Sequence, residues 1–149
     1  MKYKLYNADF NEETGISTAT IITDLGLFSG QSKLHEEDKD ICSKFSGCMF
    51  AEARAIIKYG KMIIKVQKEK VKNLKILIDN LENMNNYNKN SVEARFIRKT
   101  YFIELNKLNK YKSNLNGLKN NLYNDMKNYR EVHNAMLKKI HKEPIKDNK

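Results

Sequence analysis

Two clusters of charged residues in this chain could bind a phosphate group. The first consists of Glu52, Arg54, Lys58 and Lys61. Basic side chains pair with phosphate oxygens, and the main-chain amides at the start of a helix do the same. If a helix begins near Gly47, this cluster forms a phosphate site. If the helix begins earlier, Gly47 is only a small residue where two elements pack closely.

The second cluster combines arginine with aromatic rings. It consists of Arg95, Phe96, Arg98 and Tyr101. Arginine supplies charge for a phosphate and a ring supplies a face for a base, so the two residue types together suit a nucleotide. The same rings could instead belong to a helix core. We expect the two clusters to lie at opposite ends of one helix, where they share a pocket only across a subunit interface.

A row of basic residues, spaced alternately by four and three positions, would occupy one face of a helix. This basic row consists of Arg54, Lys58, Lys61, Lys65, Lys68, Lys72 and Lys75. It could bind phosphates or an acidic protein, or it could be the solvated flank of a coiled coil. Only four of the 28 basic residues are arginine, which argues against specific DNA recognition because arginine is preferred for bidentate contacts.

No recognisable catalytic or metal-binding motif occurs in the sequence. It lacks the glycine-rich loops that hold nucleotide phosphates and the Gly-x-Ser-x-Gly motif of serine hydrolases. His35, Cys42 and Cys48 do not have the spacing of a zinc site. We therefore expect a binding protein rather than an enzyme, with no cofactor and no metal.

The elements that must position these residues begin with a small sheet. Segments 2–9, 16–23 and 27–34 read as strands, the second of them rich in β-branched residues. Gly15 lies in the first turn, where it can adopt a positive φ. We expect a three-stranded antiparallel meander over residues 1–40, which needs a partner on its apolar face.

From about Asp40 onward the apolar residues follow a helical period. In the first helix Ile57, Ile64, Val71 and Ile78 recur every seven residues, beside columns with Ile56, Ile63, Leu77, Met84, Leu74 and Leu81. In the second the repeat is Tyr101, Leu108, Leu115, Leu122, Tyr129 and Met136, supported by Ile97, Leu105, Leu118, Met126 and Ile140. An asparagine-rich break at 83–90 separates the helices, with Asn90 or Ser91 as the cap of the second.

These patterns predict an α+β fold. A short loop between two long helices implies an antiparallel hairpin, so we expect the sheet over 1–40, a two-helix coiled-coil hairpin over 41–142 and a charged tail over 143–149. The two apolar stripes are too broad to cover each other completely. We therefore expect a homo-oligomer that associates through the helices.

Charge and composition narrow the kinds of partner. The net charge is +10, with −4 over residues 1–40 and +14 over residues 41–149. A basic surface attracts polyanions such as nucleic acid, nucleotides or acidic proteins. No apolar run is long enough to cross a membrane and the N-terminus has no signal core. We expect a cytoplasmic protein with no membrane partner.

One block of the sequence resembles a known group. Residues 27–61, LFSGQSKLHEEDKDICSKFSGCMFAEARAIIKYGK, resemble a segment of small Firmicutes phage and prophage proteins, in which a glycine-containing strand leads through an acidic linker to an Ala-Glu-x-Arg-Ala helix. Within this group the chain looks most like the Thoeris anti-defence sponge family, which combines a small N-terminal sheet, two C-terminal helices and oligomeric assembly. The likeness lies mainly in residues 1–65, and no pocket residue of that family can be placed on this chain.

The resemblance implies a phage anti-defence protein without enzymatic activity. Such a protein would sequester a nucleotide immune signal, a cyclic ADP-ribose isomer or a cyclic oligonucleotide, in the cytoplasm of an infected or lysogenic bacterium. Two alternatives stay open beside it. The chain could inhibit a host defence protein directly, as anti-CRISPR proteins do, or it could be a nucleic-acid-binding or purely structural helical oligomer.

Overall fold

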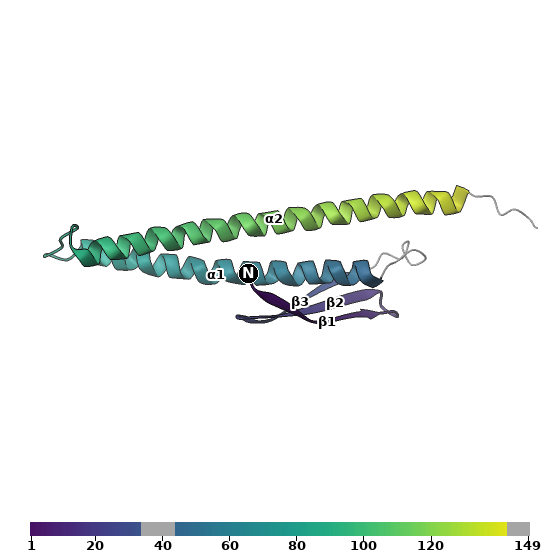
Figure 1. The fold of residues 1–149 in the computed structure, drawn as a ribbon, viewed down its shortest axis with the longest axis horizontal. Coiled ribbons are helices and arrows are strands. Elements are labelled where there is room, and N and C mark those ends of the chain that lie inside the picture. Colours follow the sequence, from purple (N-terminus) through teal and green to yellow (C-terminus); the bar gives the residue numbers. More distant parts are fainter. Residues whose placement is uncertain (34–43, 143–149) are drawn as a thin grey trace, which may run out of the picture. The chain divides into compact units, whose positions relative to one another are not determined.

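The computed structural model describes residues 1–33 and 44–142. Three strands are followed by two long helices, an α+β fold (Figure 1). The elements are β1 (Tyr3–Asn11), β2 (Ile16–Thr23), β3 (Gly26–Lys33), α1 (Lys44–Glu82) and α2 (Val92–Lys142). They form two units, one of Met1–Ile57 with Leu118–Lys149 (unit 1) and one of Lys58–Gly117 (unit 2). Both helices contribute to both units.

The sheet is the predicted antiparallel meander, with strand order β1-β2-β3. Gly15 and Gly26 occupy the two turns with φ of 67° and 110°, conformations that L side chains rarely adopt. Thr23 also supports the second turn, because its hydroxyl donates to the Gly26 carbonyl at 2.8 Å. Sequence reasoning placed all three strands to within two residues of their bounds.

Small residues on the inner face of the sheet allow α1 to approach closely. On β2, Ser17, Ala19 and Ile21 alternate and are buried, as expected for one face of a strand. A Cβ added to Gly30 on β3 would lie 2.5 Å from the main-chain nitrogen of Ala55 on α1. In unit 1 the helix therefore packs almost directly on the backbone of the sheet.

The first residues of α1 are fastened to β1 and its turn. Lys44 forms an ion pair with Glu12 and lies 5.7 Å from the ring centre of Phe10. This pairing lowers the pKa of Glu12 through a hydrogen bond and through the charge of Lys44. The half-buried thiol of Cys48 lies 3.9 Å from the Asp9 carbonyl. These contacts fix where α1 begins its path along the sheet.

The other side of α1 in unit 1 packs against the C-terminal part of α2. The rings of Phe50 and Tyr129 meet edge to face, with centres 5.4 Å apart. The first turns of α1 thus lie between the sheet and α2 (Figure 1).

Unit 2 is an antiparallel pair of helices joined by a short turn. Val71 of α1 and Leu108 and Leu115 of α2 are buried, as their seven-residue spacing predicts. The Ser91 hydroxyl accepts a hydrogen bond from the Ala94 amide at 3.1 Å, which confirms Ser91 as the cap of α2. Glu93 lies in the first turn of α2, where its charge is favourable.

Some predicted core positions differ from the structure. Leu77, Met84 and Met136 are 43%, 61% and 45% exposed, because the helix seam uses only part of each apolar stripe. At one turn of α2 the buried residue is Glu104 and not the predicted Leu105, which is only half-buried. The predicted start of the first helix near Asp40, the side chain of Ile140 and the tail 143–149 lie outside the described residues.

Candidate anion-binding surface of the hairpin

Arg54 is committed to the packing of unit 1. Its guanidinium donates to the main-chain carbonyl of Gln31, on the edge strand β3, at 2.5 Å. A second nitrogen of the group lies 3.8 Å from the sulfur of Met126 on α2. Arg54 therefore joins the sheet edge to both helices, and a side chain placed along an edge strand also protects it from unwanted pairing.

Glu52 lies between Ala51 and Ala53 in the interior of α1 and is half-buried. The helix starts no later than Lys44, so the free amides of its first turn lie well before Glu52 and Arg54. Gly47 lies within the helix, where an added Cβ would press on Ser17. Of the two interpretations of this segment, the structure has the one in which Gly47 allows close packing.

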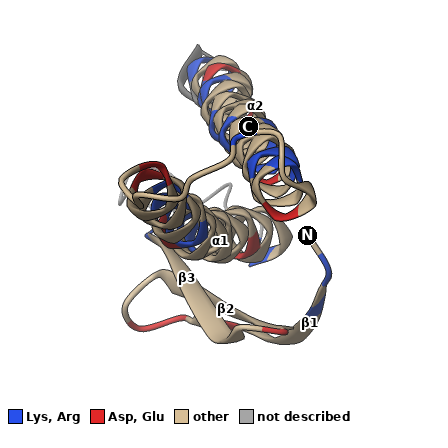
Figure 2. Ribbon diagram, turned by 90° about the vertical axis from the view of Figure 1, so that its left-hand side faces the viewer, with Lys and Arg blue, Asp and Glu red and all other residues tan. Residues whose placement is uncertain are grey.

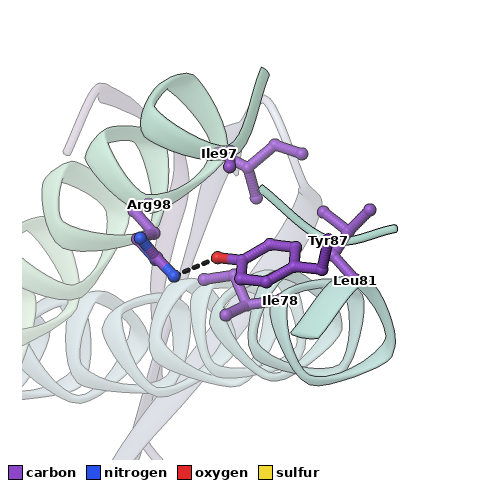
Figure 3. A pocket seen from close by; sticks show the side chains of 6 residues that line it. Ile78, Leu81, Tyr87, Ile97 and Arg98 are labelled. Atoms are coloured by element: carbon purple, nitrogen blue, oxygen red, sulfur yellow. Dashed lines mark hydrogen bonds between the residues drawn. The ribbon is translucent and has the colours of Figure 1, made fainter. Parts of the chain in front are cut away.

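Arg98, from the second predicted cluster, fastens the turn between the helices. It donates to the hydroxyl of Tyr87 (Figure 3). It also donates to the Lys89 carbonyl at 3.3 Å and to Glu82 at 3.1 Å. Its guanidinium carbon also lies 5.6 Å from the centre of the Tyr87 ring. Arg98 thus has a structural role in unit 2.

The pocket beside Arg98 is filled by its own lining. It is formed by Ile78, Leu81, Tyr87, Ala94, Ile97 and Arg98 (Figure 3). The space between these side chains is too small to admit a water molecule. It is a packed junction of α1, the turn and α2, and a nucleotide does not fit there.

The remaining members of the second cluster divide between core and surface. Tyr101 is half-buried and meets Phe102 edge to face, with ring centres 5.5 Å apart. Arg95 is exposed, and Phe96 is 68% exposed. Phe102, which sequence reasoning did not single out as a binding residue, is 60% exposed. Of the arginine and aromatic residues near the start of α2, Arg95, Phe96 and Phe102 are therefore the exposed ones.

Charge is distributed very unequally between the two units. Unit 2 holds 14 basic and five acidic residues, a net of +9, whereas the rest of the chain has a net of only +1. Figure 2 shows the basic residues recurring along both helices, while most of the sheet is uncharged. The hairpin of unit 2 is therefore the strongly basic part of the molecule.

The six lysines of the basic row all belong to unit 2 and are all exposed. They are Lys58, Lys61, Lys65, Lys68, Lys72 and Lys75. From Lys61 onward they form no ion pair with any residue that the structure describes. At 1.5 Å per residue the row extends for about 25 Å along α1.

A row of one sign has an energetic cost. Like charges three or four positions apart on a helix destabilise it by about 0.2–0.5 kcal/mol per pair. The row has five such neighbouring pairs, from Lys58–Lys61 to Lys72–Lys75, so the repulsion amounts to at most roughly 1–2.5 kcal/mol at low salt. Glu69 and Asp79, at the same spacings from Lys65, Lys72 and Lys75, offset part of it. A bound polyanion would remove this repulsion.

The same unit contains a buried polar layer that sequence reasoning missed. The Gln67 amide of α1 donates to a carboxylate oxygen of Glu104 at 2.7 Å and to the Glu104 carbonyl at 2.9 Å. Lys107 and Lys70 form ion pairs with the same carboxylate at 2.9 and 3.2 Å. The pKa of Glu104 is lowered to about 2, mainly by the hydrogen bond from Gln67. The hydrogen bonds from Lys107 and Lys70 and the charge of Lys107 lower it further, and together these effects outweigh the desolvation of the carboxylate.

The remaining observations concern metal binding, membrane-spanning segments and similarity to known proteins. Within residues 1–33 and 44–142 no three His, Cys, Asp or Glu side chains are arranged to hold a metal ion. None of the helices in these ranges has a segment long and apolar enough to cross a membrane. Compared with protein-family models, curated proteins and solved structures, the chain matches none. The likeness to the Thoeris sponges therefore stays a prediction from residues.

Proposed function

We propose that the protein binds nucleic acid along the basic row of α1 and leaves it chemically unchanged. The observation that carries the proposal is the uninterrupted series of exposed lysines in a unit with a net charge of +9. A solvated helix flank usually mixes acidic and basic residues at these spacings, because opposite charges then stabilise the helix. Here Glu69 and Asp79 stand at these spacings from only three of the six lysines, so part of the repulsion remains until an anion binds.

The dimensions of the row favour a polymer over a single nucleotide. A duplex of the same length, about 25 Å, carries about 15 phosphates, so several lysines can be neutralised at once. Lysine contacts of this kind are made to the backbone and provide affinity without base specificity. The expected activity is therefore binding that depends little on sequence and strongly on salt.

Sequestration of a nucleotide immune signal is the second candidate. It is supported by the resemblance to the sponge family and by Arg95 and Phe96, adjacent exposed residues that could provide a phosphate contact and a stacking ring. A cyclic nucleotide would engage them together with residues of another copy, in a homo-oligomer formed through the helices. An anti-defence role in the bacterial cytoplasm belongs to this candidate.

The test measures binding of fluorescent duplex DNA and RNA between about 50 and 200 mM salt, where backbone binding changes steeply. If all six lysines act, the slope of log K against log salt is about −5, since each neutralised phosphate contributes about −0.9. The double variant Lys65→Gln/Lys72→Gln should reduce the slope by about 2.

A matched pair on α2 is the control. Lys99→Gln/Lys110→Gln removes the same charge from the same unit but outside the row, and should change the slope much less. No binding, or equal effects of the two pairs, would refute the assignment to the row. Native mass spectrometry with cyclic oligonucleotides and cyclic ADP-ribose isomers tests the second candidate, and a complex with an acidic protein but not with nucleic acid would indicate a protein inhibitor.

A further inference from the structure

We infer that two copies of this chain join through strand β1, so that their three-stranded sheets continue into one antiparallel sheet. The free edge of β1 is occupied by β1 of the second copy, in the register that sets Lys4 of each copy against Asp9 of the other. This interface differs from the association through the helices that the apolar stripes predict. It belongs to unit 1 and does not depend on nucleic-acid binding by the basic row of unit 2.

The two edges of the sheet differ in how they are covered. At the β3 edge the Arg54 guanidinium donates to the Gln31 carbonyl, so a main-chain acceptor is already occupied. At the β1 edge every residue of the strand is exposed except Phe10, which is half-buried. No strand lies beyond β1 in the part of the chain that the structure describes (Figure 2). An edge of this kind is a template for pairing with another strand.

Alternation along the sheet indicates which main-chain groups of β1 point outward. The Phe10 amide donates to the Asp9 carboxylate at 2.9 Å and is thus directed away from β2. Residues of an antiparallel strand bond alternately to one neighbour and to the other, so Ser17, the partner of Phe10, bonds to β3. Ile22, five positions further on, then bonds to β1 through its partner Lys4. The residues directed at the free edge are therefore Tyr3, Leu5, Ala8 and Phe10.

An additional residue in β1 places Lys4 and Asp9 on the same face of the sheet. Residues five positions apart lie on opposite faces of a regular strand. Here β1 has one extra residue, Tyr6, where its register on β2 shifts, as in a β-bulge. Lys4 and Asp9 therefore both lie on the outer face, away from the buried residues of β2. A two-fold axis brings the extra residues of the two copies together, so the register continues on both sides of them.

One register suits the main-chain groups and the charges together. It sets the four edge-directed residues opposite one another, Tyr3 with Phe10 and Leu5 with Ala8. Lys4 and Asp9 then form the closely spaced pairs between them, which share no main-chain hydrogen bond. Neither of these two side chains forms an ion pair with any residue that the structure describes. Both are therefore available to a second copy, and in a two-fold dimer their pair occurs twice.

Charge favours a second copy over a strand of another protein. The segment around β1 has basic residues at its start and acidic residues towards and beyond its end, namely Lys2, Lys4, Asp9, Glu12 and Glu13. Antiparallel pairing of β1 with itself brings the basic start of each copy to the acidic end of the other. Charges on an edge strand discourage pairing with strands that do not match them, so the same residues select this partner.

The pairing also covers apolar side chains that α1 leaves open. Leu5 is 42% exposed, although its partner on β2, Ile21, is fully buried. Tyr3 is 45% exposed on the same face. In the dimer these two side chains lie beside Ala8 and Phe10 of the second copy, where cross-strand contacts between apolar groups stabilise a sheet.

The test reverses the paired charges one at a time in the full chain. Lys4→Glu and Asp9→Lys each replace two attractive pairs of the dimer by two repulsive ones, so the dissociation constant from analytical ultracentrifugation should rise about tenfold in each. An equimolar mixture of the two variants should regain the wild-type affinity, because every pair of the mixed dimer again joins opposite charges. Lys33→Glu is the matched control. It makes the same change at an exposed residue of the other edge strand, β3, and should leave the dimer unchanged.

Recovery in the mixture requires that both variants are folded, and circular dichroism of each variant checks this directly. A monomeric wild type would overturn the inference and leave the β1 edge to a strand of another protein. An oligomer that neither single variant weakens would place the interface elsewhere and refute it equally. So would two weakened variants that do not recover on mixing, or an equal loss in Lys33→Glu.

Discussion

Replacing Gly30 by alanine tests how closely the sheet and α1 approach each other. The new methyl carbon would lie 2.5 Å from the Ala55 nitrogen and still closer to the Ala51 carbonyl oxygen. Both are main-chain atoms of a helix, so no side chain can rotate away to make room. Ordinary contact begins at 3.4 Å, and α1 would have to move by about 1 Å or more from β3.

The loss of stability follows from the buried residues that this movement of α1 would expose. Ala19 and Ile21 on β2 and Ala51 and Ala55 on α1 are all fully buried at this contact. Overpacking of a tight core costs about 1–3 kcal/mol, and we expect the upper end because both colliding atoms belong to the backbone. For a small domain, a loss of stability of this size lowers the melting temperature by about 10 °C or more.

Gly117→Ala is the matched control. Gly117 is exposed within α2, and an added Cβ there has nothing within 4 Å. Because glycine is unfavourable in a helix by about 0.5–1 kcal/mol relative to alanine, this variant should be more stable than wild type. Both are compared by urea unfolding followed by circular dichroism. A Gly30→Ala protein as stable as wild type would refute the close packing.

Two more predictions concern polar contacts of unit 2. Glu104 has a folded pKa of about 2 and an unfolded one of about 4.3, so its stabilising effect is complete above the unfolded value and is lost as the pH falls from there towards 2. Gln67→Leu should raise the pKa of Glu104 in a carboxyl NMR titration, and an unchanged pKa would contradict the assigned cause. Arg98→Met should destabilise the hairpin by about 1–2 kcal/mol through loss of the bonds to Tyr87, Lys89 and Glu82, whereas Lys68→Met should stay within about 0.5 kcal/mol of wild type; equal melting temperatures for the two would show that the turn does not need Arg98.

The sheet and the helices could be predicted because local chemistry determines them. Gly15 permits a turn conformation that other residues resist, and β-branched residues in 16–23 favour a strand. The seven-residue spacing of buried Leu108 and Leu115 likewise marks one side of α2. Each of these signals lies within a few residues of the structure it specifies.

The fate of the arginines could not be predicted, because it depends on distant partners. Arg54 bonds to Gln31 and Met126, 23 and 72 positions away. Nothing in the local sequence distinguishes such an arginine from one that awaits a phosphate. The exposed lysines were easier to place, because their four-and-three spacing alone puts them on one side of a helix.

The buried pair of Gln67 and Glu104 shows where a stricter use of the same spacing would have helped. Gln67 lies four positions before the buried Val71, and Glu104 four before the buried Leu108, so both occupy the seam of their helix. We missed this pair because we placed every charged residue on the solvent-exposed side of its helix. One polar residue in the seam of each helix predicts that the two will form a hydrogen bond. If the helices shifted out of register, the hairpin would lose stability, because Gln67 and Glu104 would each be buried without a partner. The pair therefore gives the two helices of the hairpin one preferred alignment.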